Sequence, residues 1–361
     1  MRYVPKSACW RQVGGSFFSD DGSENEKIEA RSLDAKRGRF RLRKPRVLVL
    51  GNLPSEAISR LADQCDVEIR VDGPFTQSAL VELVQGFDGL LSLLTQRVGP
   101  EVFEAADRLS IVSNYAVGVD NVDLEAALRH GVVVSNTPDV LTDDTADLTW
   151  ALILAVVRDL AAASGYLRNG EFGGWAPDLL FGRSLRSLTL GVVGAGRIGQ
   201  AVLERARGFG VTTLYTSRRR LPSEREAHLR STWCLFPELL RSSDIVTLHT
   251  PLNSETRHMM DEVALRSMPR GGFLINTARG ALVDEAALAK VLRDGHLAGA
   301  GLDVFEQEPA VRPELLGLES AVLVPHIGSA TPETRLAMAR CCVEDLINVL
   351  VRNQDAERRV V

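Results

Sequence analysis

The sequence predicts an α/β protein with two doubly wound domains, each a parallel sheet covered by helices on both faces. Short apolar runs alternate with helical patterns from residue 46 onward, as strands and crossover helices do in parallel sheets. A second series opens at residue 188, and its first strand leads through a glycine-rich turn into a helix. A chain of 361 residues with 45% hydrophobic content is long enough for roughly two or three such cores.

The first unit begins with the apolar run 47–50, which Gly51 follows. A continuous apolar run of this length is typical of a strand buried on both faces of its sheet. Helical patterns cover residues 57–64 and 78–84. Further short apolar runs predict strands at residues 67–69, 89–94, 109–113 and 132–135. These elements together predict the first parallel sheet.

A single long helix is predicted from Thr142 to about Leu167. Asp143 and Asp144 suit its N-terminus, where the helix dipole is positive. The segment is apolar on nearly every face, so we expect it to be buried between domains or subunits. Its most apolar part, residues 150–157, is far shorter than the ~20 residues that a membrane-spanning helix needs. No membrane partner is therefore expected.

The second unit follows a glycine-rich break at residues 170–177. Its apolar runs predict six strands, and a helical pattern closes the chain over residues 332–351. The predicted strands cover residues 189–193, 212–215, 245–249, 272–276, 299–304 and 321–324. Their alternation with helical segments predicts a second parallel sheet.

The turn after residues 189–193 carries the pattern G-x-G-x-x-G at Gly194, Gly196 and Gly199, with Arg197 and Ile198 before the last glycine. Its strand–turn–helix setting is the one that a dinucleotide site requires. The first glycine permits the tight turn and the second lets a pyrophosphate approach the backbone. The third lets the helix pack closely on the strand. We therefore predict that this turn binds a dinucleotide cofactor.

The end of the next strand bears on the choice of cofactor. Ser217 stands there, followed by Arg218 and Arg219, near the position where enzymes specific for NAD place an acidic residue on the ribose 2′-hydroxyl. No carboxylate repels a 2′-phosphate, and arginine side chains bind one well. The pattern favours NADPH, with NADH as the alternative. If the arginines only form a solvated basic loop, this preference does not follow.

Three polar residues follow predicted strands of the second unit: Arg279, Glu308 and His326. A guanidinium can hold a substrate carboxylate in bidentate fashion, and a histidine can donate a proton near neutral pH. A neighbouring carboxylate would keep that histidine protonated and oriented. Taken singly, each also has a structural interpretation, as a surface ion pair, a loop carboxylate or a core histidine.

Several segments between residues 46 and 351 resemble the D-isomer-specific 2-hydroxyacid dehydrogenases, and most of all the glyoxylate/hydroxypyruvate reductases. The matching segments are residues 115–123, 136–143, 194–199, 276–280, 301–309 and 325–331. The resemblance implies that Arg279 binds the substrate carboxylate, that His326 donates the proton and that Glu308 is its partner. It also implies that the backbone at Val117 and Gly118 holds the carboxylate.

The resemblance further implies a set of residues along the cofactor, with Asp303 beside the nicotinamide carboxamide. These residues are Thr250, Pro251, Thr277, Ala278, Asp303 and Gly328. No metal site is expected. Members of the family are usually homodimers joined through the long helix after Pro138, so a homodimer is expected here. The loop at residues 170–183 is shorter than in similar members, which leaves the substrate preference open.

The family fold sets the expected domain map. A flavodoxin-like substrate-binding domain comprises residues 45–137 and 326–361, and a Rossmann nucleotide-binding domain, residues 138–325, is inserted into it. Residues 1–44 have no family counterpart. They show no apolar segment after Met1 and acidic residues from Asp20 onward, which favours a disordered extension over a targeting signal.

The charge and the cysteine content of the chain argue against some classes of protein. The net charge of −5 argues against a general nucleic-acid-binding protein, which needs a basic surplus. The five cysteines form no C-x-x-C pair, which is typical of reduced thiols in a cytoplasmic protein.

The leading hypothesis is NADPH-dependent reduction of small 2-keto acids, glyoxylate and hydroxypyruvate, to the D-2-hydroxy acids. One alternative is an NAD-dependent dehydrogenase of another 2-hydroxy acid, such as 3-phosphoglycerate or 2-ketogluconate. The similar phosphoglycerate enzymes usually carry an acidic residue where Ser217 stands. Formate dehydrogenases fit poorly, because they have Gln at the position of Glu308. A third hypothesis is a dinucleotide-sensing corepressor, for which the basic stretch at residues 37–44 is the only indication.

Overall fold

Two parallel sheets form the framework of the computed structural model, which describes residues 43–73 and 75–361. Lys44–Val361 forms one compact unit. The extension predicted over residues 1–44 lies outside the described residues, except for its last two. Every strand predicted from the sequence is present, and its bounds differ from the prediction by at most two residues.

The first sheet has five parallel strands in the order β2-β1-β3-β4-β5. They are β1 (Arg46–Leu50), β2 (Asp66–Arg70), β3 (Gly89–Leu93), β4 (Ile111–Tyr115) and β5 (Val133–Ser135). Side chains of β1 alternate between two buried clusters, because successive residues of a strand face opposite sides of the sheet. Val47 and Val49 join one cluster, and Leu48 and Leu50 join the other.

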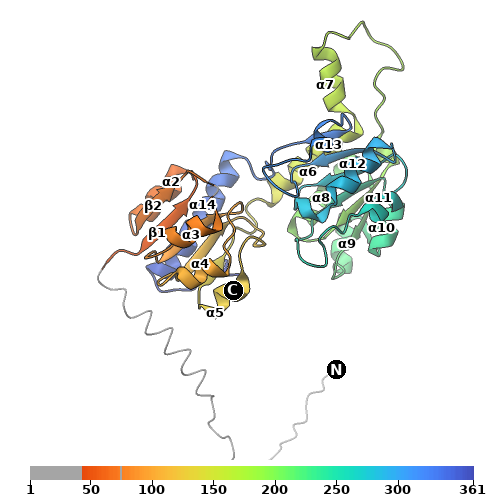
Figure 1. Ribbon diagram of the computed structural model, residues 1–361. Coiled ribbons are helices and arrows are strands. Elements are labelled where there is room, and N and C mark those ends of the chain that lie inside the picture. Colours follow the sequence, from red (N-terminus) through yellow and green to blue (C-terminus); the bar gives the residue numbers. More distant parts are fainter. Residues whose placement is uncertain (1–42, 74) are drawn as a thin grey trace, which may run out of the picture. The chain divides into compact units, whose positions relative to one another are not determined.

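Helices cover both faces of this sheet (Figure 1). The cluster of Val47 and Val49 includes α2 (Ser55–Ala62) and α14 (Pro332–Leu350). The opposite cluster includes α3 (Gln77–Leu83), α4 (Pro100–Ala105) and α5 (Leu124–Arg129). The last helix of the chain therefore packs on the first sheet, so this domain is built from two separate stretches of sequence.

The second sheet has seven parallel strands in the order β12-β11-β10-β9-β6-β7-β8. They are β6 (Thr189–Val193), β7 (Thr212–Thr216), β8 (Ser231–Trp233), β9 (Ile245–Leu248), β10 (Gly272–Asn276), β11 (Leu297–Leu302) and β12 (Ala321–Leu323). The strand order changes direction between β6 and β9, and open parallel sheets bind ligands at such a point. Strand β8 was not predicted from the sequence, because this three-residue edge strand contains no apolar run.

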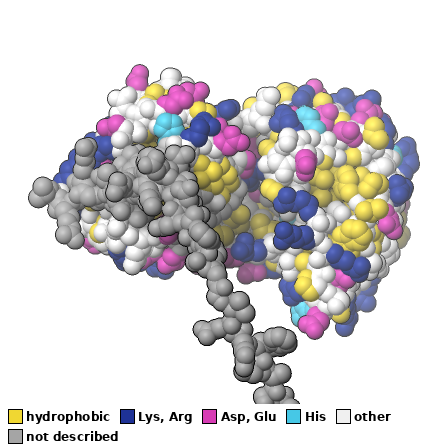
Figure 2. Space-filling model, turned by 90° about the horizontal axis from the view of Figure 1, so that it is seen from below, with side chains coloured by type: hydrophobic (Ala, Val, Ile, Leu, Met, Phe, Trp, Pro, Cys, Tyr) yellow, Lys and Arg dark blue, Asp and Glu magenta, His cyan; other side chains and the backbone are white. Residues whose placement is uncertain are grey.

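Helices also cover both faces of the second sheet. One buried cluster includes α6 (Thr142–Val157), α8 (Arg197–Phe209) and α9 (Ser223–Leu229). The other includes α10 (Phe236–Ser242), α11 (Glu262–Ser267), α12 (Glu285–Arg293) and α13 (Pro313–Leu316). Short 3₁₀ turns at Leu185–Ser187 and Gly280–Leu282 complete the elements. On the face drawn in Figure 2, basic and acidic side chains are interspersed over the described surface.

The prediction of one buried helix from Thr142 to Leu167 was wrong. Two helices, α6 and α7 (Leu160–Arg168), meet at a 63° bend. The chain breaks because Asp159 adopts a left-handed conformation with φ of 49°, which helical residues cannot have. Half of the residues of α6 are buried, whereas no residue of α7 is buried. Within residues 43–73 and 75–361, no single helix combines the length and hydropathy of a membrane span.

Candidate active site

The carboxyl ends of strands from both sheets border one cleft. It is lined by the loops that follow β3 and β4 of the first sheet and β6, β9, β10, β11 and β12 of the second. Most of the residues predicted to form the site line this cleft. They are Val117, Gly118, Gly196, Arg197, Ile198, Thr250, Pro251, Thr277, Ala278, Arg279, Asp303, His326 and Gly328. Residues far apart in the sequence thus face the same space.

The glycine turn between β6 and α8 is shaped to receive a pyrophosphate. Gly194 has a φ of +97°, a conformation that only glycine adopts without strain. A Cβ added to Gly199 would lie 2.0 Å from the carbonyl oxygen of Gly194, whereas one added to Gly196 would meet nothing within 4 Å. The open side at Gly196 is where α8 begins, and helix N-termini attract phosphate groups. The turn therefore fits a dinucleotide.

The end of β7 lies directly beside this turn, because the amide of Gly194 donates a hydrogen bond of 2.8 Å to the carbonyl oxygen of Thr216. Ser217 comes next, and its hydroxyl donates to the carbonyl oxygen of Arg219. Arg218 and Arg219 are exposed, and neither forms an ion pair with another residue that the structure describes. Both guanidinium groups are therefore free to meet an anion.

A buried tyrosine fixes the loop that carries these arginines. The hydroxyl of Tyr215 donates to Glu226 at 2.6 Å and accepts from the amide of Leu221 at 2.8 Å. Arg220 donates to the same carboxylate through two nitrogens, each at 2.8 Å. The hydrogen bonds from Arg220 and Tyr215 lower the pKa of Glu226 to about 2. Arg220 thus acts as an anchor of the loop.

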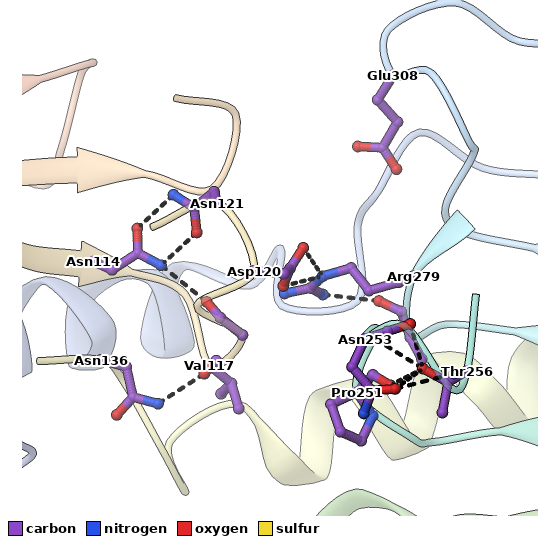
Figure 3. Close-up of polar contacts among 12 residues, drawn as sticks. Asn114, Val117, Asp120, Asn121, Asn136, Pro251, Asn253, Thr256, Arg279 and Glu308 are labelled. Carbon is purple, nitrogen blue, oxygen red and sulfur yellow. Dashed lines mark hydrogen bonds and ion pairs between the residues drawn. The ribbon is translucent and has the colours of Figure 1, made fainter. Parts of the chain in front are cut away.

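The loop after β4 presents Val117 and Gly118 to the cleft, and asparagine amides hold it from behind (Figure 3). The side-chain nitrogen of Asn136 donates to the carbonyl oxygen of Val117 at 2.7 Å, and that of Asn114 donates to the carbonyl oxygen of Gly118 at 2.9 Å. Asn114 and Asn121 also exchange hydrogen bonds of 3.0 and 3.1 Å. The carbonyl oxygens of the loop are thereby occupied, which fixes its backbone.

The loops after β9 and β10 line the cofactor side of the cleft. The hydroxyl of Thr256 donates to the carbonyl oxygen of Pro251 at 2.8 Å. The hydroxyls of Thr277 and Thr149 lie 2.9 Å apart, which ties the end of β10 to α6. Buried Asn276 donates to the carbonyl oxygen of Arg279 at 2.8 Å and accepts from the amide of Ala278 at 3.0 Å. These bonds fix the turn from which Arg279 projects.

Arg279 extends from this turn toward the loop after β4 (Figure 3). Its Nε donates to both carboxylate oxygens of Asp120, at 2.9 and 3.1 Å, and its Nη1 donates to the carbonyl oxygen of Ala278 at 2.8 Å. The side chain of Arg279 is 23% exposed. It therefore stays accessible to a small anion in the cleft.

His326 and Glu308 form a hydrogen-bonded pair in which Nδ1 lies 2.8 Å from Oε2. The other carboxylate oxygen accepts from the amide of Phe305 at 3.0 Å. Burial alone would raise the pKa of Glu308, but the hydrogen bond and charge of His326, with the Phe305 amide, outweigh burial and lower it. Glu308 is therefore ionised near neutral pH, and Nε2 of His326 is the ring nitrogen left for a substrate.

Asp303 is buried directly behind this pair. Its carboxylate oxygens accept from the amides of Ile327 at 2.6 Å and Gly328 at 2.9 Å, and its carbonyl oxygen accepts from the amide of His326 at 2.8 Å. Burial raises the pKa of Asp303. These bonds secure the backbone of His326, whose φ is +53°. The structure thus shows Asp303 both lining the cleft and fixing the turn that carries the histidine.

Some predicted residues lie outside the cleft lining. Gly194 and Gly199 form the base of the glycine turn, and Ser217, Arg218 and Arg219 lie at the neighbouring strand end. Glu308 lines adjoining cavities together with His326. Sequence reasoning missed the roles of four polar residues, Asn114, Asp120, Asn136 and Asn276. The last three lie within segments matched to the family, but only the fold shows which atoms they contact.

The sequence of this chain is similar to known proteins over most of its length. The NAD binding domain of the D-isomer specific 2-hydroxyacid dehydrogenases matches residues 150–328. A glyoxylate reductase of Thermococcus onnurineus is 46% identical over 309 residues, which are 84% of this chain and 92% of that protein. A glyoxylate reductase of Pyrococcus furiosus is 44% identical over the same shares of both chains.

Solved structures give the same assignment. The TT0316 protein from Thermus thermophilus is 45% identical, with a TM-score of 0.81, over 88% of this chain and 100% of its own. An NADPH-dependent glyoxylate/hydroxypyruvate reductase from Sinorhizobium meliloti, solved with NADP and malonate, is 33% identical, with a TM-score of 0.77, over 88% and 97%. Both the fold and the sequence therefore place the chain among the same proteins.

Proposed function

The chain belongs to the D-isomer-specific 2-hydroxyacid dehydrogenases and is an NAD(P)-dependent oxidoreductase, and from this premise we propose that it reduces glyoxylate and hydroxypyruvate to the D-2-hydroxy acids with NADPH. The main support is that Arg279 and His326 line one cleft beside the glycine turn, and that Glu308, from an adjoining cavity, bonds to His326. The substrate is supported by the relatives that are named glyoxylate reductases.

The reaction needs a hydride, a group that binds the substrate carboxylate and a group that donates a proton. NADPH, when bound at the glycine turn, supplies the hydride that reduces the keto carbon. Arg279 binds the substrate carboxylate together with the backbone amides at Val117–Gly118, which aligns the carbonyl group. His326 donates a proton from Nε2 to the carbonyl oxygen, since Nδ1 is held by Glu308. The anionic carboxylate of Glu308 stabilises the protonated imidazole before that transfer.

A substrate panel tests this proposal directly. We expect the purified protein to oxidise NADPH in the presence of glyoxylate or hydroxypyruvate, measured as loss of absorbance of the reduced nicotinamide. The panel should also contain 2-ketogluconate and phosphohydroxypyruvate, each with NADPH and with NADH. Turnover of one of the latter two alone would overturn the substrate assignment, and no turnover of any member would overturn the proposed reaction.

The preference for NADPH has its own test. Replacing Arg218 and Arg219 together with Ala removes two cations from the expected position of the 2′-phosphate. Because a hydrogen bond to a charged group contributes about 1.5–3 kcal/mol, we expect kcat/KM for NADPH to fall about tenfold or more while that for NADH changes little. Arg241→Ala, an exposed arginine on α10, is the matched control. An unaltered ratio of the two cofactors would show that the arginines are only surface charge.

The proposal includes a homodimer. Helix α7 and the loop after it expose large apolar side chains, among them Leu167, Trp175 and Phe181, and clustered exposed apolar surface marks interaction sites. A second copy of the chain would cover these side chains. A mass near twice 39.4 kDa in light scattering would support the dimer, and a monomer at micromolar concentration would contradict it.

A further inference from the structure

We infer that Asp120 is a positioning residue, which turns the guanidinium of Arg279 so that one nitrogen faces the carboxylate of the substrate. The inference rests on the proposed role of Arg279 in binding that carboxylate. Asp120 lies in the loop after β4, and Arg279 lies in the loop after β10, 159 positions later. Their ion pair joins the two sheets' loops across the cleft (Figure 3).

The three guanidinium nitrogens have different surroundings. Nε donates to both oxygens of Asp120, and Nη1 donates to the carbonyl oxygen of Ala278. Nη2 has no hydrogen-bond partner within residues 43–73 and 75–361, and it lies against Gly118: a Cβ added there would be 1.8 Å from it. Two nitrogens are thus used to fix the group. The third is left beside the Val117–Gly118 backbone.

Asp120 can fix the group because its own loop is rigidly held. The side-chain nitrogen of the adjacent Asn121 donates to the carbonyl oxygens of Leu93 and Gln96, at 3.1 and 2.9 Å. Asn114 contacts both Asn121 and the carbonyl oxygen of Gly118. An arginine side chain has several rotatable bonds, and ordering it costs entropy when a ligand binds. Asp120 orders it beforehand.

Asp120 could also have the opposite effect and weaken substrate binding. A carboxylate close to Arg279 repels a second carboxylate and offsets part of the positive charge. If repulsion dominated, removing Asp120 would tighten substrate binding. Bonding to Nε rather than to Nη2 argues for the positioning effect, because the nitrogen beside Gly118 remains available to the substrate.

The test compares Asp120→Ala with Asp120→Asn in the full-length protein. With Asp120→Ala we expect KM for the 2-keto acid that the wild-type protein reduces best to rise roughly 10- to 100-fold, with a smaller fall in kcat. Asn keeps an oxygen that accepts from Nε, so Asp120→Asn should recover part of the lost affinity. Glu104→Ala, an exposed carboxylate on α4, should change neither constant.

Three results would overturn the inference. The first is an unchanged or lower KM in Asp120→Ala. The second is that Asp120→Ala loses NADPH affinity and thermal stability as strongly as it loses substrate affinity. A residue that positions Arg279 for the substrate should leave NADPH affinity and thermal stability nearly unaltered. The third is additivity in a double-mutant cycle. Because Asp120 acts through Arg279, its removal from an Arg279→Ala background should cause no further loss of affinity for oxamate, a non-reducible 2-keto acid analogue, measured by calorimetry with NADPH present.

These measurements separate the inference from the proposed function. If Arg279→Ala leaves the affinity for oxamate unchanged, the proposed role of Arg279 fails, whatever Asp120 does. If Arg279→Ala weakens oxamate binding and Asp120→Ala does not, only the inference about Asp120 fails.

Discussion

Replacing His326 with Gln is expected to lower kcat for 2-keto acid reduction by about 10²- to 10⁴-fold, the usual range for the loss of a general acid. Glutamine is of similar length and can form hydrogen bonds, but it cannot act as an acid at neutral pH. The affinity for NADPH should stay nearly constant, because the proposed role of His326 is toward the substrate and Asp303 holds its backbone in place. Stopped-flow absorbance with saturating NADPH gives the rate of the chemical step directly.

His130→Gln provides the control for this prediction. His130 caps the end of α5 and does not line the cleft, so its loss should leave kcat unchanged. A general acid is expected to contribute far more than threefold to the rate. If His326→Gln kept kcat within about threefold of the wild-type value, another group would have to donate the proton. The pairing of His326 with Glu308 would then be only structural.

Replacing Arg279 with Ala is the second change for which we expect a large effect. It removes the guanidinium that faces the Val117–Gly118 backbone and leaves Asp120 without its partner. Truncating one partner of a hydrogen-bonded charge pair costs about 2–5 kcal/mol, so kcat/KM should fall about 30- to 5,000-fold, with a raised KM and a lowered kcat. Steady-state kinetics over a range of substrate concentrations separates the two constants.

Arg279→Lys is the informative companion of that variant. Lysine keeps the charge but lacks the planar fork that bonds Asp120, Ala278 and a substrate at once. We expect it to restore only part of the lost activity. Full restoration would show that charge alone suffices, and that the orientation of the guanidinium has no role in catalysis.

The local patterns of the sequence predicted the strands and the glycine turn correctly. Apolar runs such as residues 47–50 became buried strands, because burial on both faces of a sheet requires nothing beyond the run itself. Gly194 and Gly199 have the positive φ and the close backbone contact that the motif required of them. Such features depend on neighbours within a few residues, so a sequence can specify them alone.

The break between α6 and α7 was not predicted from the local sequence pattern. Residues 142–167 carry apolar side chains on nearly every helical face and contain no proline, so the sequence pattern indicated one helix. The chain turns at Asp159 instead. Half of α6 is packed against the second sheet, whereas α7 has left it. Packing, which the pattern of apolar residues does not encode, decided where the helix ends.

The sequence by itself determined the fold class, the dinucleotide turn and the three residue types that the chemistry needs, because each is written in a short stretch of chain. Only the tertiary structure decided how these residues are held. Asp120 and Arg279 are 159 positions apart, and His326 and Glu308 come from different loops. Whether such side chains meet depends on the order of the strands and on where each strand ends. No single stretch of sequence contains that information.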